Sequence, residues 1–395
     1  MDFSEQTLKY IEFADLNKRK ELGQYFTPQS VIREILQHLP YSKNDGIDIL
    51  EPSYGTGEFL YMLQEKYPLA KIDAIEYDDI LFNISLKHFQ NINLINEDTL
   101  LYDFKDKKYD LVIGNPPYFE FKISEELKER YKDVITGRIN IFNLFVKTGI
   151  DLLKPNGYLA FVIPPSMNNG AYFKGLRDYI IKNCDIRDIL FKSSDLFHDA
   201  QQSVMVLILQ KNNNSGRYVF THAGITIFTK EDKMLEKEFN QLNTYSLKDL
   251  GYKVVTGSVV WNQNKEKLSD DDKDTLLIWS HNIQDNKLIL NNKPKKQYIK
   301  DMLPLKGPAI VVNRVTGSVG TGSLRIAMIE KDKGFLAENH VNVIIPDNNE
   351  KQLKTLEEVY INLKNKDNLS GLIQAITGNT QLSKTELERL IPLTF

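Results

Sequence analysis

Short apolar runs rich in β-branched residues alternate with amphipathic stretches between residues 45 and 210. This alternation is typical of a sheet whose faces are covered by helices, and it predicts an α/β fold with a mostly parallel sheet. Proline or glycine ends the helical patterns at Glu58–Lys66 and Ile141–Leu153. Strands are expected at six apolar runs: Ile47–Leu50, Ile72–Glu76, Asn93–Ile95, Asp110–Gly114, Tyr158–Ile163 and Val204–Gln210.

The chain is long enough for two domains. It has 395 residues, of which 42% are hydrophobic, so it can bury a large core. The polar segment Lys211–Gly216 is rich in turn formers and ends the alternating region. We therefore predict a first domain over residues 1–215, with an upper limit for its boundary near 245, and a second domain over residues 216–395.

Charge and cysteine content narrow the class of protein. The chain has 50 Lys and Arg against 53 Asp and Glu, which gives a net charge of −3. This charge excludes a protein that coats nucleic acid with a broadly basic surface, but it allows a local basic cleft. Its single cysteine and six scattered histidines show no zinc-ligand spacing, so no metal is expected. The polar start and the absence of a long apolar run predict a soluble, cytoplasmic protein.

A glycine turn follows the first predicted strand, at Glu51-Pro-Ser53-Tyr-Gly55-Thr-Gly57. Gly55 and Gly57 allow the backbone to approach a ligand closely, and Glu76 ends the next strand, where a carboxylate accepts hydrogen bonds from ribose hydroxyls. The two acids predict a nucleoside ligand. In isolation, an ordinary strand-to-helix turn explains the glycines equally well.

The form of this turn disfavours NAD and ATP. A glutamate leads it, no third glycine opens the helix, and no Lys-Ser or Lys-Thr follows. A carboxylate ahead of the turn suits a ligand with an ammonium group. S-adenosylmethionine carries both the ribose and the ammonium, so it is the predicted cofactor.

The tetrapeptide Asn115-Pro116-Pro117-Tyr118 follows the predicted strand Asp110–Gly114, at the edge where open α/β sheets hold their ligands. The two prolines fix the backbone and remove donors, which leaves carbonyl acceptors for an amine. An amide oxygen and a carbonyl that accept both N–H bonds of a nucleobase amine favour a pyramidal nitrogen, whose lone pair can attack a sulfonium methyl. Tyr118 offers a flat face for the base. The alternative is a proline-rich turn with a capping Asn.

In this order the motifs resemble the amino-group DNA methyltransferases, specifically the N6-adenine gamma group of type II restriction-modification enzymes. The resemblance covers about the first half of the chain. It implies a Rossmann-like S-adenosylmethionine-dependent catalytic domain over residues 1–215 and a DNA target-recognition domain over residues 216–395. The implied cofactor-binding residues are Tyr25, Thr27, Glu51, Ser53, Gly55, Gly57, Glu76, Asp98, Asn115 and Pro117.

Within this resemblance, Tyr25 and Thr27 would touch the methionine part of the cofactor, and Asp98 would accept from its adenine amino group. The implied catalytic residues are Asn115, Pro116, Pro117, Tyr118 and Phe197. Phe197 corresponds to an aromatic that stacks on the flipped adenine, although a core phenylalanine before an edge strand explains it equally well. Base flipping is also required by the chemistry, because N6 is paired inside the duplex.

The second half supplies possible DNA contacts. Arg314 and Arg325 can make bidentate contacts to guanine, and a lysine cluster can contact phosphates. The same half contains both tryptophans, Trp261 and Trp279. The alternative explanation is that the lysines only face solvent and that the tryptophans only pack in the core. The charged stretch Glu120–Arg138 predicts a mobile loop that closes over DNA. The predicted DNA-binding residues are Lys293, Lys295, Lys296, Arg314 and Arg325.

The leading hypothesis is a site-specific adenine N6-methyltransferase that acts on double-stranded DNA as a monomer and is paired with a separate restriction endonuclease. About 20 residues precede Gly23, so no nuclease domain is expected there. One alternative is an enzyme that methylates a protein glutamine or an RNA base, because the same motif suits those amino groups. Another is a catalytically silent subunit that binds nucleic acid.

Overall fold

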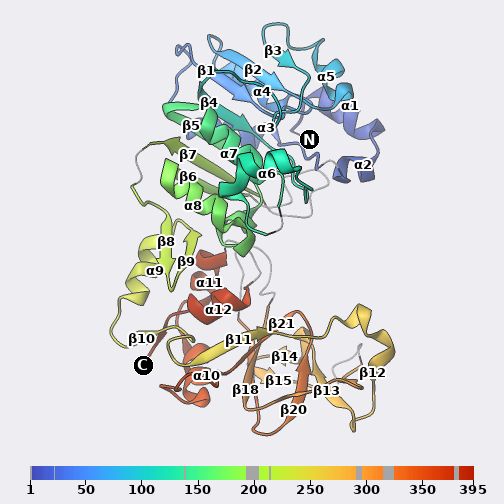
Figure 1. Ribbon diagram of the computed structural model, residues 1–395, viewed down its shortest axis with the longest axis vertical. Helices are drawn as coiled ribbons and strands as arrows, with labels where there is room; N and C mark the ends of the chain where they lie inside the picture. Colours follow the sequence, from blue (N-terminus) through green and yellow to red (C-terminus); the bar gives the residue numbers. More distant parts are fainter. Residues whose placement is uncertain are drawn as a thin grey trace. The chain divides into compact units, whose positions relative to one another are not determined.

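The computed structural model describes residues 2–21, 23–137, 139–192, 204–212, 215–290, 296–314, 324–377 and 382–395. The chain divides into two compact units, Met1–Val219 and Phe220–Phe395 (Figure 1). The domain change predicted after residue 215 lies close to this division.

The first unit is built on a sheet with the strand order β3-β2-β1-β4-β5-β7-β6. Strands β1 to β5 pair in parallel, and β7 is antiparallel to both β5 and β6. This arrangement confirms the predicted Rossmann-like α/β fold with a mostly parallel sheet. The strands are β1 Asp48–Glu51, β2 Lys71–Ile75, β3 Asn93–Ile95, β4 Tyr109–Gly114, β5 Leu153–Ile163, β6 Cys184–Lys192 and β7 Val204–Lys211.

Helices cover both faces of this sheet (Figure 1). On one face, the buried side chains of Ile32 and Leu60, from two neighbouring helices, pack into the same core as Ile49 of β1. The helices are α1 Glu5–Phe13, α2 Leu16–Glu21, α3 Gln29–Gln37, α4 Glu58–Lys66, α5 Asp79–Ser85, α6 Glu125–Tyr131, α7 Phe142–Leu152 and α8 Lys174–Asn183.

The stretch Glu120–Arg138 is more ordered than a loop. It contains α6, which begins because the Ser124 hydroxyl accepts a hydrogen bond from the Leu127 N–H. The helix buries Leu127 and Tyr131, and the Tyr131 hydroxyl lies 2.7 Å from that of Thr148 in α7. The charged side chains that suggested a loop lie on the other side of a short amphipathic helix, so the expectation of a loop throughout this stretch was wrong.

The second unit contains two larger sheets, with the strand orders β11-β21-β18-β19 and β12-β16-β13-β20-β17. Alternate residues of β18 face two different cores: Ile310 and Val312 pack with the helices, and Val311 packs with the second sheet. The strands of the two sheets are β11 Tyr252–Thr256, β12 Leu268–Ser269, β13 Thr275–Ile278, β16 Tyr298–Ile299, β17 Leu305–Lys306, β18 Ala309–Asn313, β19 Ile326–Ile329, β20 Gly334–Ala337 and β21 Val341–Pro346.

In the part of this unit that the structure describes, short hairpins and four α-helices accompany the two sheets. The remaining elements are β8 Val219–His222, β9 Ile225–Phe228, α9 Asp232–Phe239, β10 Thr244–Tyr245, β14 Ile283–Gln284, β15 Lys287–Leu288, α10 Leu356–Asn365, α11 Leu369–Thr377, α12 Lys384–Arg389 and β22 Leu393–Thr394.

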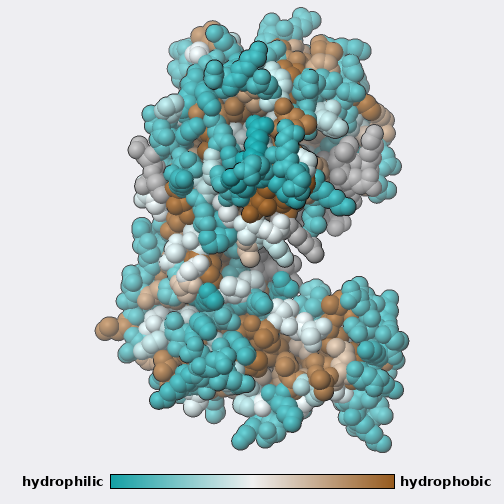
Figure 2. Space-filling view, viewed as in Figure 1, coloured by the Kyte–Doolittle hydropathy of each residue, from teal (hydrophilic) through white to brown (hydrophobic). Residues whose placement is uncertain are grey.

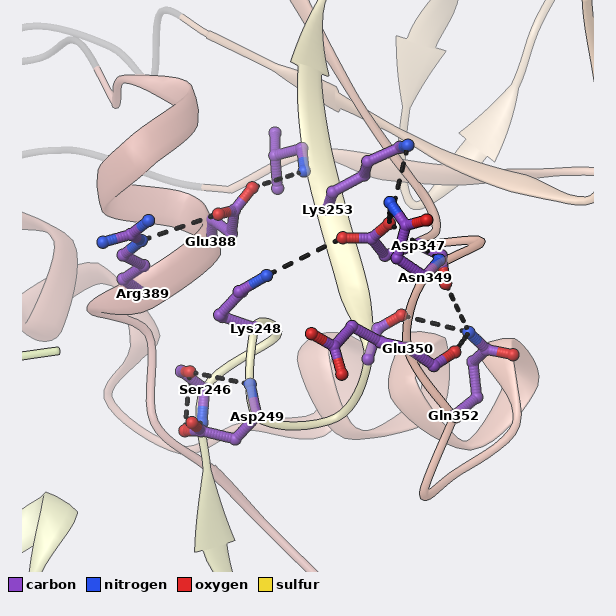
Figure 3. A network of polar contacts seen from close by, with 12 residues as sticks. Ser246, Lys248, Asp249, Lys253, Asp347, Asn349, Glu350, Gln352, Glu388 and Arg389 are labelled. Atoms are coloured by element: carbon purple, nitrogen blue, oxygen red, sulfur yellow. Dashed lines mark hydrogen bonds and ion pairs between the residues drawn. The ribbon is translucent and has the colours of Figure 1, made fainter.

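A polar network ties β11 to its surroundings (Figure 3). The Glu388 carboxylate of α12 accepts a hydrogen bond of 2.8 Å from the Val254 N–H. Asp347 lies 3.7 Å from the ammonium groups of both Lys248 and Lys253. These contacts fix one edge of the four-stranded sheet without requiring a ligand.

Polar side chains cover most of the face shown in Figure 2, and apolar side chains are confined to smaller groups. Among the described residues, no helix combines the length and the apolar character that crossing a membrane requires.

Candidate active site

A cavity of about 760 Å³ opens within the first unit. It lies where β1, β2, β3 and β4 end, the edge at which open α/β sheets hold their ligands. Gly57 is absent from its lining, as are Pro116 and Tyr118, and Phe197 lies outside the described residues. Nine of the ten predicted cofactor-binding residues line it: Tyr25, Thr27, Glu51, Ser53, Gly55, Glu76, Asp98, Asn115 and Pro117.

The glycine turn connects β1 to α4 in a left-handed conformation. Gly55 and Gly57 have φ angles of +58° and +88°, which side chains rarely adopt. A Cβ at residue 57 would lie 2.5 Å from the Phe89 ring, so packing also requires glycine there. Gly57 therefore shapes the turn, whereas Gly55 lines the cavity.

Glu76 is held in place by backbone donors. Its two carboxylate oxygens accept hydrogen bonds of 2.8 Å from the N–H groups of Gly55 and Asp78. Burial raises its pKa to about 7, although the two backbone donors oppose this rise. Because each carboxylate oxygen has two acceptor positions, both oxygens can still accept from a ligand.

Glu51 is the most deeply buried acid of the site. Its side chain is 1% exposed, and its Oε2 atom has no hydrogen-bond partner among the described residues. Burial, together with the nearby charge of Glu76, raises its pKa well above the usual range for glutamate. A buried acceptor without a partner is costly, so the site is suited to a ligand that brings a donor.

The segment that contains Tyr25 and Thr27 contacts the catalytic motif directly. The Asn115 side-chain N–H₂ donates to the Tyr25 carbonyl at 2.8 Å and to the Thr27 hydroxyl at 3.1 Å. Gly23 allows this approach, because a Cβ there would lie 2.7 Å from the Tyr118 nitrogen. Both N–H groups of Asn115 are thus used, which fixes the direction of its side-chain oxygen.

Tyr118 supports Asn115 from the other side. Its hydroxyl lies within hydrogen-bonding distance of the Asn115 Oδ1 atom and 2.7 Å from the Val162 carbonyl oxygen. Its ring stacks on Tyr25 with a centroid separation of 6.1 Å. Burial raises the pKa of Tyr118 well above its usual value, so the hydroxyl remains a donor at neutral pH. The geometry thus gives Tyr118 a contact to Asn115 that the motif alone did not predict.

The N-terminal helix α1 also holds the glycine turn, which the sequence reasoning missed. The Gln6 side-chain N–H₂ donates to the Thr56 carbonyl at 3.0 Å, and the hydroxyls of Thr7 and Thr56 lie 2.6 Å apart. The Ser4 hydroxyl donates to Glu58 at 2.6 Å. Contacts between residues some 50 positions apart leave no periodic signal in a sequence.

Apolar residues at the cavity were missed as well. Tyr77 and Ile80 line it although they are 73% and 48% exposed. Tyr77 directly follows Glu76, and Ile80 comes four residues after it. An exposed aromatic after an acid at a strand end is the signal that could have located them. Other apolar residues of the lining include Phe119, Phe121, Ile141 and Phe145.

The predicted DNA-binding residues divide into separate groups. Arg314 directly follows β18 and Arg325 directly precedes β19, and these strands are neighbours. The Lys296 ammonium donates to the Leu268 carbonyl at 3.3 Å, beside the second sheet. Lys293 and Lys295 lie outside the described residues. Within the described ranges, no cluster of three or more His, Cys, Asp or Glu suited to a metal is present.

Several known proteins are similar to this chain. The modification methylase CviBIII of Paramecium bursaria Chlorella virus NC1A is 25% identical over 99% of this chain and 98% of its own length. The type II methyltransferase M.AccI of Acinetobacter calcoaceticus is 27% identical over 66% of this chain, which spans about half (51%) of that relative. A type I restriction-modification methyltransferase subunit from Streptococcus thermophilus is 19% identical, with a TM-score of 0.43, over 56% of this chain and 55% of its own.

A family model shows which part of the chain is similar to known methylases. The model described as the Eco57I restriction-modification methylase matches residues 44–197, which include the glycine turn, Glu76 and the Asn-Pro-Pro-Tyr motif. Residues 44–197 therefore form a methylase domain of the Eco57I restriction-modification family.

Proposed function

We propose that this restriction-modification methylase transfers the methyl group of S-adenosylmethionine to the N6 atom of adenine in double-stranded DNA. The observation that carries this proposal is the convergence of Glu51, Glu76 and Asn115 on one cavity at the carboxyl ends of neighbouring strands. The cavity thus combines acceptors for a nucleoside with an acceptor for an amine.

The residues present fit the cofactor. Glu76 offers two oxygens to the ribose hydroxyls, and the unpartnered oxygen of Glu51 suits the ammonium group. Asp98 follows β3 at the same cavity and is proposed to accept from the adenine amino group of the cofactor. When bound, S-adenosylmethionine supplies an electrophilic methyl on a sulfonium. Metal ions have no part in this proposal.

Asn115 and its neighbours would orient the amine of the target base. Both Asn115 N–H groups are used by Tyr25 and Thr27, so the Oδ1 atom is the part of the amide that can accept from N6. The Pro116 carbonyl is the second proposed acceptor. Accepting both N–H bonds draws the nitrogen lone pair out of conjugation and aims it at the methyl, and the proton leaves during or after transfer.

The target adenine must leave the duplex to reach this cavity, because N6 is paired inside it. Tyr118 and Phe197 remain the proposed aromatic partners of the flipped base. The second unit is proposed to recognise the DNA sequence, with Arg314 and Arg325 as contacts. A monomer suffices for this chemistry, and a separate restriction endonuclease is the proposed functional partner.

The deciding experiment is methyl transfer from labelled S-adenosylmethionine to mixed-sequence duplex DNA, followed by digestion to nucleosides. We expect the label in N6-methyladenine. Label in N4-methylcytosine would keep the cofactor and overturn the base assignment. Label only in RNA or in protein glutamine would overturn the DNA assignment, and cofactor binding without transfer to any acceptor would indicate a silent binding subunit.

The affinity for S-adenosylmethionine should fall as pH decreases through 7. Burial raises the pKa of Glu76 to about 7, so its carboxylate is mostly ionised at pH 8 and mostly protonated at pH 6. A protonated acid loses acceptor capacity for the ribose hydroxyls. If only the ionised form binds, calorimetry should show a dissociation constant about tenfold higher at pH 6 than at pH 8.

The Glu76→Gln variant is the control for this pH dependence. It lacks the titrating carboxylate but keeps the shape of the side chain, so any remaining pH dependence belongs to the ligand or to other residues. Equal pH dependence in the wild type and in this variant would contradict the role assigned to Glu76.

A further inference from the structure

Three residues with cationic or hydrogen-bonding side chains, Arg314, Arg325 and His340, lie at one end of the four-stranded sheet in the second unit. Because β18 is antiparallel to both β19 and β21, its last residue lies beside the first residues of its neighbours. The Asn313 N–H donates to the Arg325 carbonyl at 3.0 Å, and the Arg314 N–H donates to the His340 carbonyl at 2.9 Å. The backbones of Arg314, Arg325 and His340 therefore gather at one edge, here named the sheet-end surface.

A buried acid holds the imidazole of His340 in place. Glu338 is 4% exposed, and its carboxylate accepts from the His340 N–H at 3.1 Å and from its Nδ1 atom at 2.6 Å. The His340 side chain is 53% exposed. With Nδ1 used by Glu338, the Nε2 atom is the ring nitrogen left for a ligand.

The backbone around this turn is also tightly packed. The Val341 N–H donates to the Glu338 carbonyl at 2.8 Å, and the Gly257 N–H donates to the Val341 carbonyl at 2.8 Å. A Cβ at Gly257 would lie 2.1 Å from the Glu338 carbonyl oxygen, so no larger residue fits there. His340 is thus presented by a fixed turn, which is the preorganisation that recognition of a ligand requires.

Among the described residues, neither arginine has an anionic partner. Neither guanidinium has a hydrogen-bond or ion-pair partner within the described ranges, and the Nε atom of Arg314 is buried without one. Leaving the buried Nε–H of Arg314 without a partner is costly, and a ligand with several acceptors in a plane would satisfy it and pair with both guanidinium groups. Phosphate oxygens and the guanine edge in the major groove both have this geometry.

We propose that Arg314, Arg325 and His340 act together as a duplex-DNA contact surface, with Glu338 holding the imidazole. This inference rests on the proposed function and adds to it a third contact residue, His340, and a common location. A chain with a net charge of −3 can bind DNA only through local concentrations of donors, and the sheet-end surface is one.

The test uses the full chain with three single variants: Arg314→Ala, Arg325→Ala and His340→Ala. Lys331→Ala is the matched control, because Lys331 is exposed and follows β19 at its opposite end. Binding to a duplex that contains the mapped methylation site is measured by fluorescence anisotropy. We expect each sheet-end variant to bind about tenfold more weakly, whereas the control and the affinity for S-adenosylmethionine stay unchanged.

The salt dependence of the DNA affinity distinguishes a contact to phosphate from a contact to a base, and either contact supports the proposal. Loss of a phosphate contact lowers the slope of log K against log[salt] by about 0.9 and weakens binding to any duplex. Loss of a base contact weakens binding only to the duplex with the target site. Wild-type affinity in all three variants would overturn the proposal.

Two further measurements distinguish a loss of DNA contact from a loss of folding, and a failure of this inference from a failure of the proposed function. Thermal melting identifies a variant that fails to fold, and His340→Gln then replaces His340→Ala as a polar substitute that should still lose affinity. A wild-type chain that neither binds nor methylates DNA would refute the proposed function itself, whereas normal methylation by all variants would refute only the sheet-end surface.

Discussion

The Asn115→Ala variant should lose about 10²–10³-fold in the rate of methyl transfer while its affinity for S-adenosylmethionine changes little. The substitution removes the Oδ1 acceptor that would polarise the target amine. Among the described residues, no hydrogen bond joins the Asn115 side chain to the carboxylate of Glu51 or Glu76. The substitution should therefore leave these two cofactor-binding acids in place. Single-turnover kinetics at saturating cofactor measure the chemical step separately from binding.

An isosteric variant tests the orientation of the amide as well as its presence. Asn115→Asp keeps an oxygen but loses the two N–H donors to the Tyr25 carbonyl and the Thr27 hydroxyl, and it sets a carboxylate against that carbonyl. We expect a loss of turnover similar to that of Asn115→Ala. Asn44→Ala, at an exposed site, is the matched control. Near-normal turnover in Asn115→Ala would refute the assigned role.

The strands of the first unit were predictable because most of them are short apolar runs. All six predicted strands are present, within a few residues at either end. The strand β6 was missed because Asp185, Arg187 and Asp188 interrupt its apolar residues. β6 forms by pairing antiparallel to β7, whose side chains are mostly buried. Its own sequence therefore needs fewer apolar residues.

The positions of the site residues followed from the fold, but their contacts did not. Once β1, β2 and β4 are parallel neighbours, Glu51, Glu76 and Asn115 must meet at one edge. The hydrogen bonds from Asn115 to Tyr25 and Thr27 depend on how a segment 90 residues away folds over that edge. The same holds for Arg314 and His340, which a strand register brings together. Such contacts depend on three-dimensional packing, which no local pattern encodes.

The Glu51→Gln variant should be more stable than the wild type and yet bind S-adenosylmethionine about 10- to 100-fold more weakly. Burial raises the pKa of Glu51 well above that of an unfolded glutamate, so the folded state must hold a proton that the unfolded state releases as pH rises. This cost to stability is absent below the unfolded pKa and grows as pH rises towards the folded pKa. Glutamine carries no charge and avoids it.

The gain in stability from Glu51→Gln should therefore be small near pH 5 and larger at pH 8. For a unit of 219 residues, relief of about 1–3 kcal/mol corresponds to a rise in Tm of about 3–8 °C. Glu65→Gln makes the same chemical change at an exposed position of α4 and should alter neither Tm nor cofactor affinity. Unchanged cofactor affinity in the Glu51→Gln variant would contradict the role assigned to the Glu51 carboxylate in binding S-adenosylmethionine.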